Sequence, residues 1–200
     1  MKRLVRVVRW LVVSEIGVWR SLFLWITRRV PGMGPRAQAF SYSRQIAPIL
    51  WAFIFVSLIE LPVVHLLIPW DGVRLVVLIV SVWGLLWMVG MLASMKVFLH
   101  LLDEHGLRIR YGWGVDIRVP REAIETVRAK RGSARTKQTV GVEGTVADVA
   151  VMNQTRVEVV LREPTTIALP DGPRELTALH FYADDARAVV EAARADGLVT

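Results

Sequence analysis

A run of cations between residues 128 and 137 is the densest group of side chains in the sequence that could bind a ligand. No acidic residue occurs after Arg128 until Glu143. The cations of this cluster are Arg128, Lys130, Arg131, Arg135 and Lys137. Clustered guanidinium and ammonium groups attract phosphate and anionic lipid headgroups. Contact of this basic loop with such an anion is therefore a hypothesis, and a solvated, mobile hairpin loop is the favoured interpretation.

Glu60 is a second candidate because it lies inside a long apolar stretch. It precedes Pro69 by nine residues, which is about 13 Å along a helix. An ionisable group at that depth in a bilayer marks a functional site by default, either a proton relay or a contact with a partner helix. The alternative is a protonated carboxyl that hydrogen-bonds to Ser57, Ser81 or a backbone carbonyl.

The apolar N-terminal segment carries a third group of cations. At 100° per residue its basic residues, including Arg6, Arg9 and Arg20, fall within one sector of about 120°. This stripe predicts an amphipathic helix on the inner leaflet that contacts anionic lipid. A transmembrane span over residues 10–27 is the alternative. Arg20 and Glu15 argue against the span, because a charge at mid-bilayer costs at least about 2.5 kcal/mol.

The segment that follows imitates a signal-peptide cleavage site at Ala37-Gln38-Ala39. Three arginines precede it where a signal peptide needs an apolar stretch, so we reject that interpretation. We expect a hinge at residues 31–35 and a short polar approach to the membrane at 36–45, which completes a first region of residues 1–45.

Motifs for catalysis are absent from the sequence. It contains no GxxxxGK[ST], HExxH, GxSxG or GxGxxG pattern and no cysteine, and its four histidines lack metal-ligand spacing. Asp103, Glu104 and His105 could form a site, but a polar linker at the membrane interface is the simpler interpretation. We predict no catalytic residue, no metal, no cofactor and no enzymatic activity. A membrane enzyme built from residues far apart in sequence is the least favoured alternative.

Two apolar runs within residues 46–102 must position these groups. The first covers residues 46–69 and the second covers 73–102, with Asp71-Gly72 between them. A helix crosses the roughly 30 Å apolar core of a bilayer in about 20 residues, so both runs are long enough. We predict a transmembrane helical hairpin with a tight turn.

The net charge of +7 is unevenly distributed. Residues 1–102 hold 11 Lys and Arg against three acids, whereas residues 103–200 hold 14 against 15. The basic half is therefore the membrane half, which argues against a nucleic-acid partner. Lys and Arg concentrate on the cytoplasmic side of membranes, so we expect both termini to be cytoplasmic. Arg outnumbers Lys by 21 to 4, a bias that suggests a high-GC bacterial genome. With the predicted hairpin, we therefore expect a bacterial inner-membrane protein.

From residue 103 onward the pattern changes to the period of two that is typical of β-strands. The strands that we predict cover residues 107–111, 115–119, 123–127, 156–161, 165–169 and 175–182. The period then changes to 3.6, with Asp184 as the N-cap and Gly197 as the stop of a final helix. The fold class is α+β, with a small sheet or partly open barrel that is capped by a helix.

This order is similar to that of the bacterial pleckstrin-homology-like (PH-like) domains that follow a membrane hairpin in uncharacterised membrane proteins. The similarity lies in Asp103–Ile109, Val119–Val127 and Phe181–Asp185, and it extends over residues 103–196. The resemblance implies a barrel-like sheet with a C-terminal helix, usually without known catalysis. The region 128–155 departs from that pattern.

The expected function is therefore that of a membrane protein that presents a cytoplasmic PH-like domain, residues 103–200, as an interaction or lipid-contact module. The expected partners are the lipid bilayer, anionic lipid, and a second copy or another membrane protein. The alternative is a subunit of a transport or proton-coupled assembly that uses Glu60.

Overall fold

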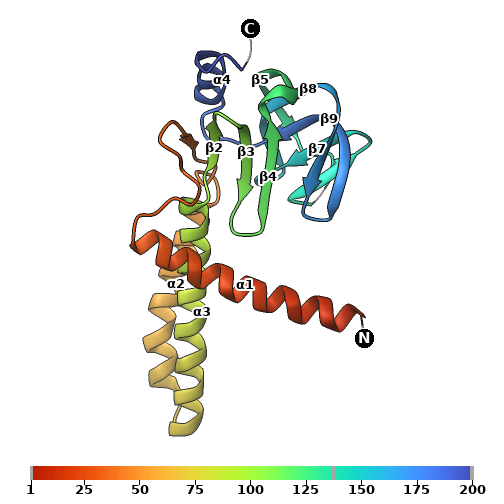
Figure 1. Cartoon of the computed structure of the whole chain (residues 1–200). Helices are drawn as coiled ribbons and strands as arrows, with labels where there is room; N and C mark the ends of the chain where they lie inside the picture. The colour runs from red at the N-terminus through yellow and green to blue at the C-terminus, as the bar shows by residue number, and fades with distance from the viewer. Residues whose placement is uncertain (1, 137, 199–200) are drawn as a thin grey trace.

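The computed structural model describes residues 2–136 and 138–198, with side-chain surroundings from residue 12 onward. Within these residues the chain forms α-helices and two β-sheets, so the α+β class is confirmed. The helices are α1 (Lys2–Ile26), α2 (Ala47–Leu67), α3 (Asp71–Val97) and α4 (Ala186–Ala195). Figure 1 shows the β-strands and α4 gathered in one domain, from which the α2–α3 hairpin projects.

The hairpin is long and apolar enough to cross a membrane at both helices. α2 has 21 residues, about 31 Å at 1.5 Å per residue, which matches the thickness of a bilayer core. Apolar side chains point outward along it, with Phe55 65% and Leu66 83% exposed. A core helix of a water-soluble protein would bury such residues, so the exposed surface fits lipid as its solvent.

α3 has 27 residues and extends beyond this apolar length. Its buried residues are confined to its last eight positions: Gly90, Leu92, Ala93, Ser94, Met95 and Val97. The last turns of α3 are therefore enclosed by protein, whereas the preceding part of the helix is largely exposed. α2 and α3 contact each other through a small cluster of Ala47, Ile54 and Leu92.

α1 runs across the hairpin and extends beneath the β domain (Figure 1). It meets α3 at Gly90, where an added methyl group would lie 2.4 Å from the Val18 side chain. On its other side, a methyl group on Gly17 would lie 2.4 Å from the ring of Trp113, in the turn between β3 and β4. Trp113 also stacks edge-on against Trp87 of α3, with ring centroids 6.3 Å apart. α1 is thus held between α3 and the β domain.

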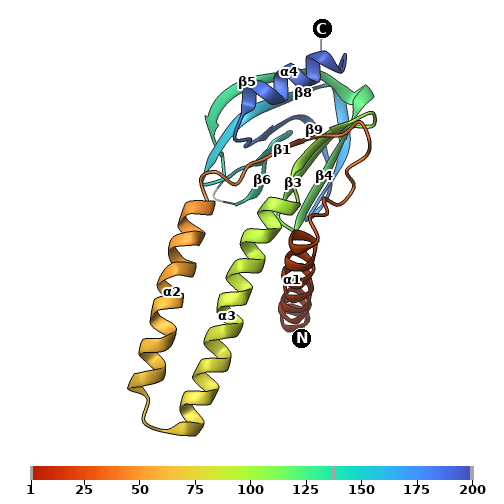
Figure 2. The same cartoon turned by 90° about the vertical axis from the view of Figure 1, so that its left-hand side faces the viewer.

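Four antiparallel strands in the order β1-β2-β3-β4 form the first sheet. They are β1 (Gln38–Phe40), β2 (His100–Asp103), β3 (Gly106–Tyr111) and β4 (Val115–Pro120). The strands predicted at 107–111 and 115–119 are confirmed as β3 and β4, which pair as an antiparallel hairpin. β1 is unexpected, since the sequence suggested only a polar approach there. Phe40 pairs with His100, so the whole α2–α3 hairpin is inserted between two neighbouring strands (Figure 2).

Five strands in the order β5-β8-β9-β7-β6 form the second sheet. They are β5 (Ile124–Ser133), β6 (Val140–Glu143), β7 (Val146–Val149), β8 (Gln154–Leu169) and β9 (Gly172–Phe181). β7 and β9 are parallel, and the other pairs are antiparallel. The two sheets share one apolar core, to which α4 contributes Val189 and Val190. They do not close into a barrel.

Two details of the predicted strands and helix were wrong. Residues 156–161 and 165–169 belong to one strand, β8, because the chain passes Pro164 by a register shift between Val160 and Thr165 instead of a turn. The N-cap of α4 is Asp185, whose carboxylate accepts hydrogen bonds from two backbone N–H groups. Asp184 accepts instead from the backbone N–H of Arg44, which fastens the start of the hairpin to the β domain.

A second apolar cluster joins the hairpin to the β domain. Its buried members are Tyr42, Met95, Val151 and Tyr182. They come from the segment before α2, the end of α3, the loop after β7 and the end of β9. The end of α3 is therefore packed as part of the β domain, which fixes how this domain stands on the hairpin.

Candidate functional site

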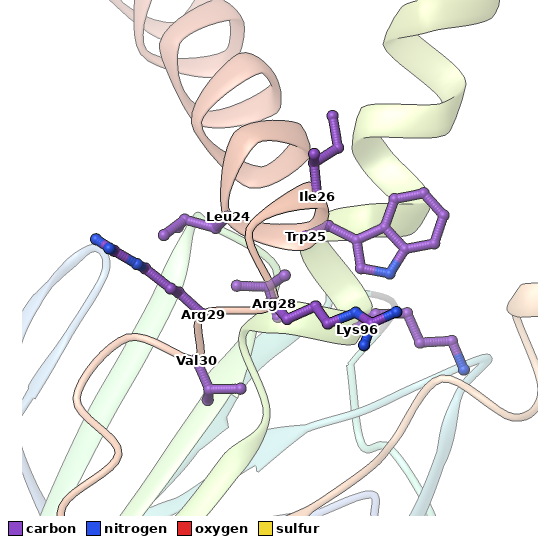
Figure 3. A pocket seen from close by; sticks show the side chains of 8 residues that line it. Leu24, Trp25, Ile26, Arg28, Arg29, Val30 and Lys96 are labelled. Carbon is purple, nitrogen blue, oxygen red and sulfur yellow. The ribbon is translucent and has the colours of Figure 1, made fainter.

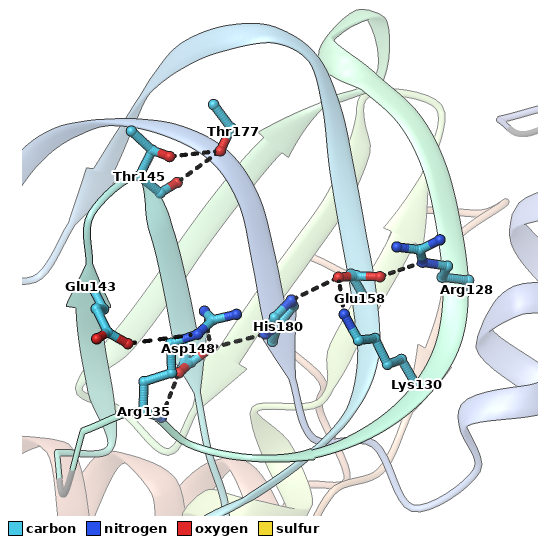
Figure 4. A network of polar contacts seen from close by, with 9 residues as sticks. All are labelled: Arg128, Lys130, Arg135, Glu143, Thr145, Asp148, Glu158, Thr177 and His180. Atoms are coloured by element: carbon cyan, nitrogen blue, oxygen red, sulfur yellow. Dashed lines mark hydrogen bonds and ion pairs between the residues drawn. The ribbon is translucent and has the colours of Figure 1, made fainter.

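The largest polar network crosses the outer face of the five-stranded sheet (Figure 4). The strand register places Arg128 opposite Glu158, Glu158 opposite His180, and His180 opposite Asp148. Basic and acidic side chains therefore alternate across four neighbouring strands, which is the favourable cross-strand arrangement. We call these four residues, with Lys130 and Arg135, the charge ladder.

The contacts in the charge ladder are short. His180 Nε2 lies 3.0 Å from Glu158 Oε1, and its Nδ1 lies 3.1 Å from Asp148 Oδ1. Lys130 Nζ donates to Glu158 at 2.8 Å, and Arg128 Nε donates to the other oxygen of that carboxylate. The backbone N–H of Arg135 donates to Asp148 at 2.8 Å. Both acids are buried, with side chains 2% and 7% exposed for Asp148 and Glu158.

The electrostatics of Glu158 follow from these contacts. Burial raises the pKa of its carboxyl, but hydrogen bonds from Arg128, Lys130 and His180 outweigh the effect of burial and lower the pKa to about 2. The carboxylate is therefore ionised at neutral pH and neutralises the cations around it.

The predicted basic loop is thus largely a strand, and most of its cations already have partners. Arg128, Lys130 and Arg131 lie in β5, and the first two are paired with Glu158. Arg135 contacts Asp148 and Glu143. Arg131 is exposed, and Lys137 lies outside the described residues. The structure brings this cluster together, but as one side of an internal salt-bridge network.

Sequence reasoning missed the acidic side of the charge ladder. Asp148, Glu158 and His180 each stand between two buried apolar residues of a strand, as in Ala147-Asp148-Val149. Three such triplets were the available signal. Their convergence depends on β7, which was not predicted, and on a register that alternation alone does not fix.

A second polar site is a cavity of about 270 Å³ between α1 and the β3–β4 hairpin, which we call the arginine cavity. Arg20 of α1 lines it together with Arg108, Arg110 and Asp116. Arg108 makes a two-pronged ion pair with Asp116. The Arg110 side chain is only 2% exposed, and its Nε lies 3.8 Å from the same carboxylate. Burial, and then the charge of Arg108, lower the pKa of Arg110 to about 10.

Arg110 also ties the first linker to the β domain, because its guanidinium donates to the carbonyl of Pro31 at 2.8 Å. Its other terminal nitrogen is buried without a hydrogen-bond partner among the described residues. Arg20 is thus brought to a cationic cavity, as part of the predicted basic stripe. The side chains of Arg6 and Arg9 lie outside the described residues.

A third site is an open groove of about 500 Å³ where α1 and α3 end (Figure 3). We call it the α1–α3 groove. Its cations are Arg28, Arg29 and Lys96, and its lining contains no acidic residue. Its apolar lining consists of Leu24, Trp25, Ile26, Val30 and Val97. Figure 3 shows Arg28 and Lys96 extending toward the same side, whereas Arg29 extends the opposite way.

The remaining sequence candidates do not converge on one another. Glu60 is exposed on α2 and makes no hydrogen bond to Ser57 or Ser81 within the described residues. His100 is buried in β2. Its Nδ1 accepts a hydrogen bond from the backbone N–H of Arg110, and its Nε2 lies 2.8 Å from the Tyr182 carbonyl oxygen. Burial lowers the pKa of His100 to about 4. His105 is exposed beside Glu104.

Among the described residues no group of three or more His, Asp or Glu side chains is arranged to hold a metal ion. Comparison of the chain with models of protein families, with curated proteins and with solved structures finds no match.

Proposed function

We propose that the protein is a multi-pass protein of a bacterial inner membrane that holds its β domain against the cytoplasmic leaflet and contacts anionic lipid there. α2 and α3 cross the bilayer, the turn between them lies outside, and both termini are cytoplasmic. The observation that carries the proposal is the crossing of α1 over α3 at Gly90, immediately before the part of α3 that is buried in protein.

The depth of this crossing supports an interfacial α1. Counted from the hairpin turn, Gly90 is the twentieth residue of α3, about 29 Å along the helix. That distance equals the thickness of the apolar core, so the crossing falls at the level of the headgroups. A basic amphipathic helix at that level is attracted by anionic lipid, by about 1 kcal/mol for each Lys or Arg.

The insertion of the hairpin between β1 and β2 supports the same topology. Both ends of the hairpin lead into one sheet, so the two ends lie on the side of the β domain. The net positive charge of residues 1–102 favours the cytoplasm for that side. The PH-like assignment is part of this proposal, and the order of strands followed by a closing helix supports it.

Depth measurements test the position of α1. The chain has no cysteine, so a single cysteine carries a unique label. We expect labels at Ile16 and Phe23, which are exposed, to lie at the same shallow depth by lipid-attached quenchers, with Phe55 as the deep control. A transmembrane α1 would separate the first two labels by about 10 Å and would overturn the proposal.

Labelling also tests the orientation of the hairpin. The connection between the helices is residues 68–70, and the predicted turn residues Asp71 and Gly72 instead begin α3. A cysteine at Gly72, in the first turn of α3, should react with an impermeant reagent that is added outside the cell. A cysteine at Glu191 in α4, which is exposed, should react only after the membrane is permeabilised. The reverse pattern would contradict the proposed topology.

A second candidate function rests on the exposure of Glu60. It stands on the outer surface of α2, where lipid would leave it unpaired at a cost of several kcal/mol if charged. A partner helix with a matching polar group would remove this cost, as in a subunit of a proton-coupled assembly. Glu60→Gln should then change co-purification of that partner, and unchanged co-purification and growth would exclude the role.

A further inference from the structure

We propose that the α1–α3 groove binds one anionic glycerophospholipid of the surrounding leaflet, with the headgroup phosphate held between Arg28 and Lys96. The inference rests on the proposed function, because it assumes that the ends of α1 and α3 lie in the headgroup layer.

The groove brings two cations together in a lining that contains no acidic residue. Arg28 follows α1 and Lys96 lies in the last turn of α3, so two separate elements bring like charges to one groove. No carboxylate lines it to neutralise them. Lys130 of the charge ladder differs in this respect, because its ammonium group donates to Glu158 at 2.8 Å. An anion between Arg28 and Lys96 replaces their repulsion by two charge-assisted hydrogen bonds.

The depth of the groove identifies the source of the anion. Lys96 is the twenty-sixth residue of α3, about 37 Å from the start of the helix and hence beyond the roughly 30 Å apolar core. Its ammonium group therefore reaches the layer that contains the lipid phosphates. Trp25 is 38% exposed beside it, which is the position that tryptophan favours at a membrane interface.

The apolar part of the lining favours a whole lipid over a free anion. Leu24 and Ile26 border the cations, and Ile26 is 71% exposed. An acyl chain that lies against these side chains buries apolar surface on both partners at about 25 cal/mol per Å². A small soluble anion would leave that surface in water.

The backbone at Arg28 is a further supporting observation. Its φ is +53°, and the Arg29 N–H donates to the Leu24 carbonyl at 2.9 Å, which is the pattern of a Schellman helix end. Glycine is the usual residue at this left-handed position, and another residue costs about 1 kcal/mol there. The chain carries arginine at a position where backbone geometry alone would favour glycine.

This geometry supplies a variant that separates binding from folding. Arg28→Gly removes the cation but suits the backbone, so it should retain or raise thermal stability while it weakens lipid binding. Lys96→Gln removes the second cation from the other helix. Arg29→Gln is the matched control, because it makes the same change of charge one residue away on a side chain that points elsewhere (Figure 3).

Native mass spectrometry of the full chain in detergent, titrated separately with phosphatidylglycerol and phosphatidylcholine, tests the proposal. We expect one phosphatidylglycerol to bind at least tenfold more tightly than phosphatidylcholine. Arg28→Gly and Lys96→Gln should each weaken phosphatidylglycerol binding about tenfold, and Arg29→Gln less than twofold. Equal effects of all three variants would overturn the site.

The same titration separates failure of the site from failure of the proposed function. If the wild-type chain prefers phosphatidylglycerol but the Arg28 and Lys96 variants keep that preference, the groove is not the site and the general lipid contact stands. If the wild-type chain shows no preference between the two lipids, both the site and the anionic-lipid contact are wrong.

Discussion

The cations of the charge ladder and those of the α1–α3 groove differ in their partners. In the ladder, Lys130 and Arg128 face a carboxylate that is only 7% exposed. In the groove, Arg28 and Lys96 share a lining without an acid. The two groups look alike in sequence, but the first is neutralised by buried carboxylates of the sheet, whereas the second has no acid in its lining and, in our proposal, is neutralised by a ligand. Acidic partners on neighbouring strands, more than the local density of charge in the sequence, decide which cations are available to bind an external anion.

The largest effect should come from removing the acid at the centre of the ladder. Glu158→Gln leaves Arg128, Lys130 and His180 without their shared carboxylate, so we expect the free energy of unfolding to fall by about 2 kcal/mol. Thermal or denaturant unfolding of the purified chain measures it. Glu163→Gln, an exposed position on the same strand, is the control, and an equal loss for both variants would contradict the ladder's role.

A pH series should break the ladder in the wild-type chain. The pKa of Glu158 is lowered to about 2 from its usual 4.5. A depressed carboxyl contributes stability that is fully present above its unfolded pKa and is lost as pH falls through the folded value. The difference in unfolding free energy between wild type and Glu158→Gln should therefore shrink from pH 4.5 to pH 2. A difference that persists at pH 2 would show that the charge of Glu158 is not its cause.

A smaller effect is expected at the edge of the ladder. Arg135→Gln removes side-chain contacts with Asp148 at 3.3 Å and Glu143 at 3.7 Å, but the backbone N–H that donates to Asp148 remains. We expect a loss of about 1 kcal/mol in denaturant unfolding. A loss as large as that of Glu158→Gln would mean that Asp148, rather than Glu158, is the main anchor of the network.

The smallest effect on stability should come from the groove. Lys96→Gln removes an exposed cation that has no carboxylate partner among the described residues, so lipid-free unfolding should change by less than about 0.5 kcal/mol. The same unfolding assay measures it, in detergent without added lipid. A loss of stability as large as that of Arg135→Gln would contradict the contrast between the groove and the charge ladder, since it would reveal an internal partner for Lys96.

Much of the architecture could be predicted because its determinants are local. The α2–α3 hairpin follows from apolar length, and the β3–β4 hairpin follows from alternation on either side of Gly112-Trp113-Gly114. Gly197, with φ of +67°, marks the end of α4 as expected. Each of these features depends on neighbours in sequence, which is why periodicity and turn chemistry revealed it.

The candidate sites could be predicted only in part, because they depend on contacts between distant segments. Cations at Arg28 and Lys96 were visible in the sequence, but their shared groove depends on the way α1 crosses α3. That crossing needs the close approach of Val18 to Gly90. At the same end of α3, Ser94 lies beside Gly112 of the turn between β3 and β4. The resemblance to PH-like domains stays a prediction.

The pairing of β1 with β2 has a consequence for biogenesis. Phe40 and His100 are register partners, although the whole hairpin separates them along the chain. A ribosome therefore releases β1 before β2, with both helices of the hairpin synthesised in between. In the topology that we propose, β1 and β2 would pair only after these helices have entered the bilayer, so folding of the first sheet would follow membrane insertion. A soluble version for biophysical work would need a short reverse turn between these two residues rather than a simple truncation.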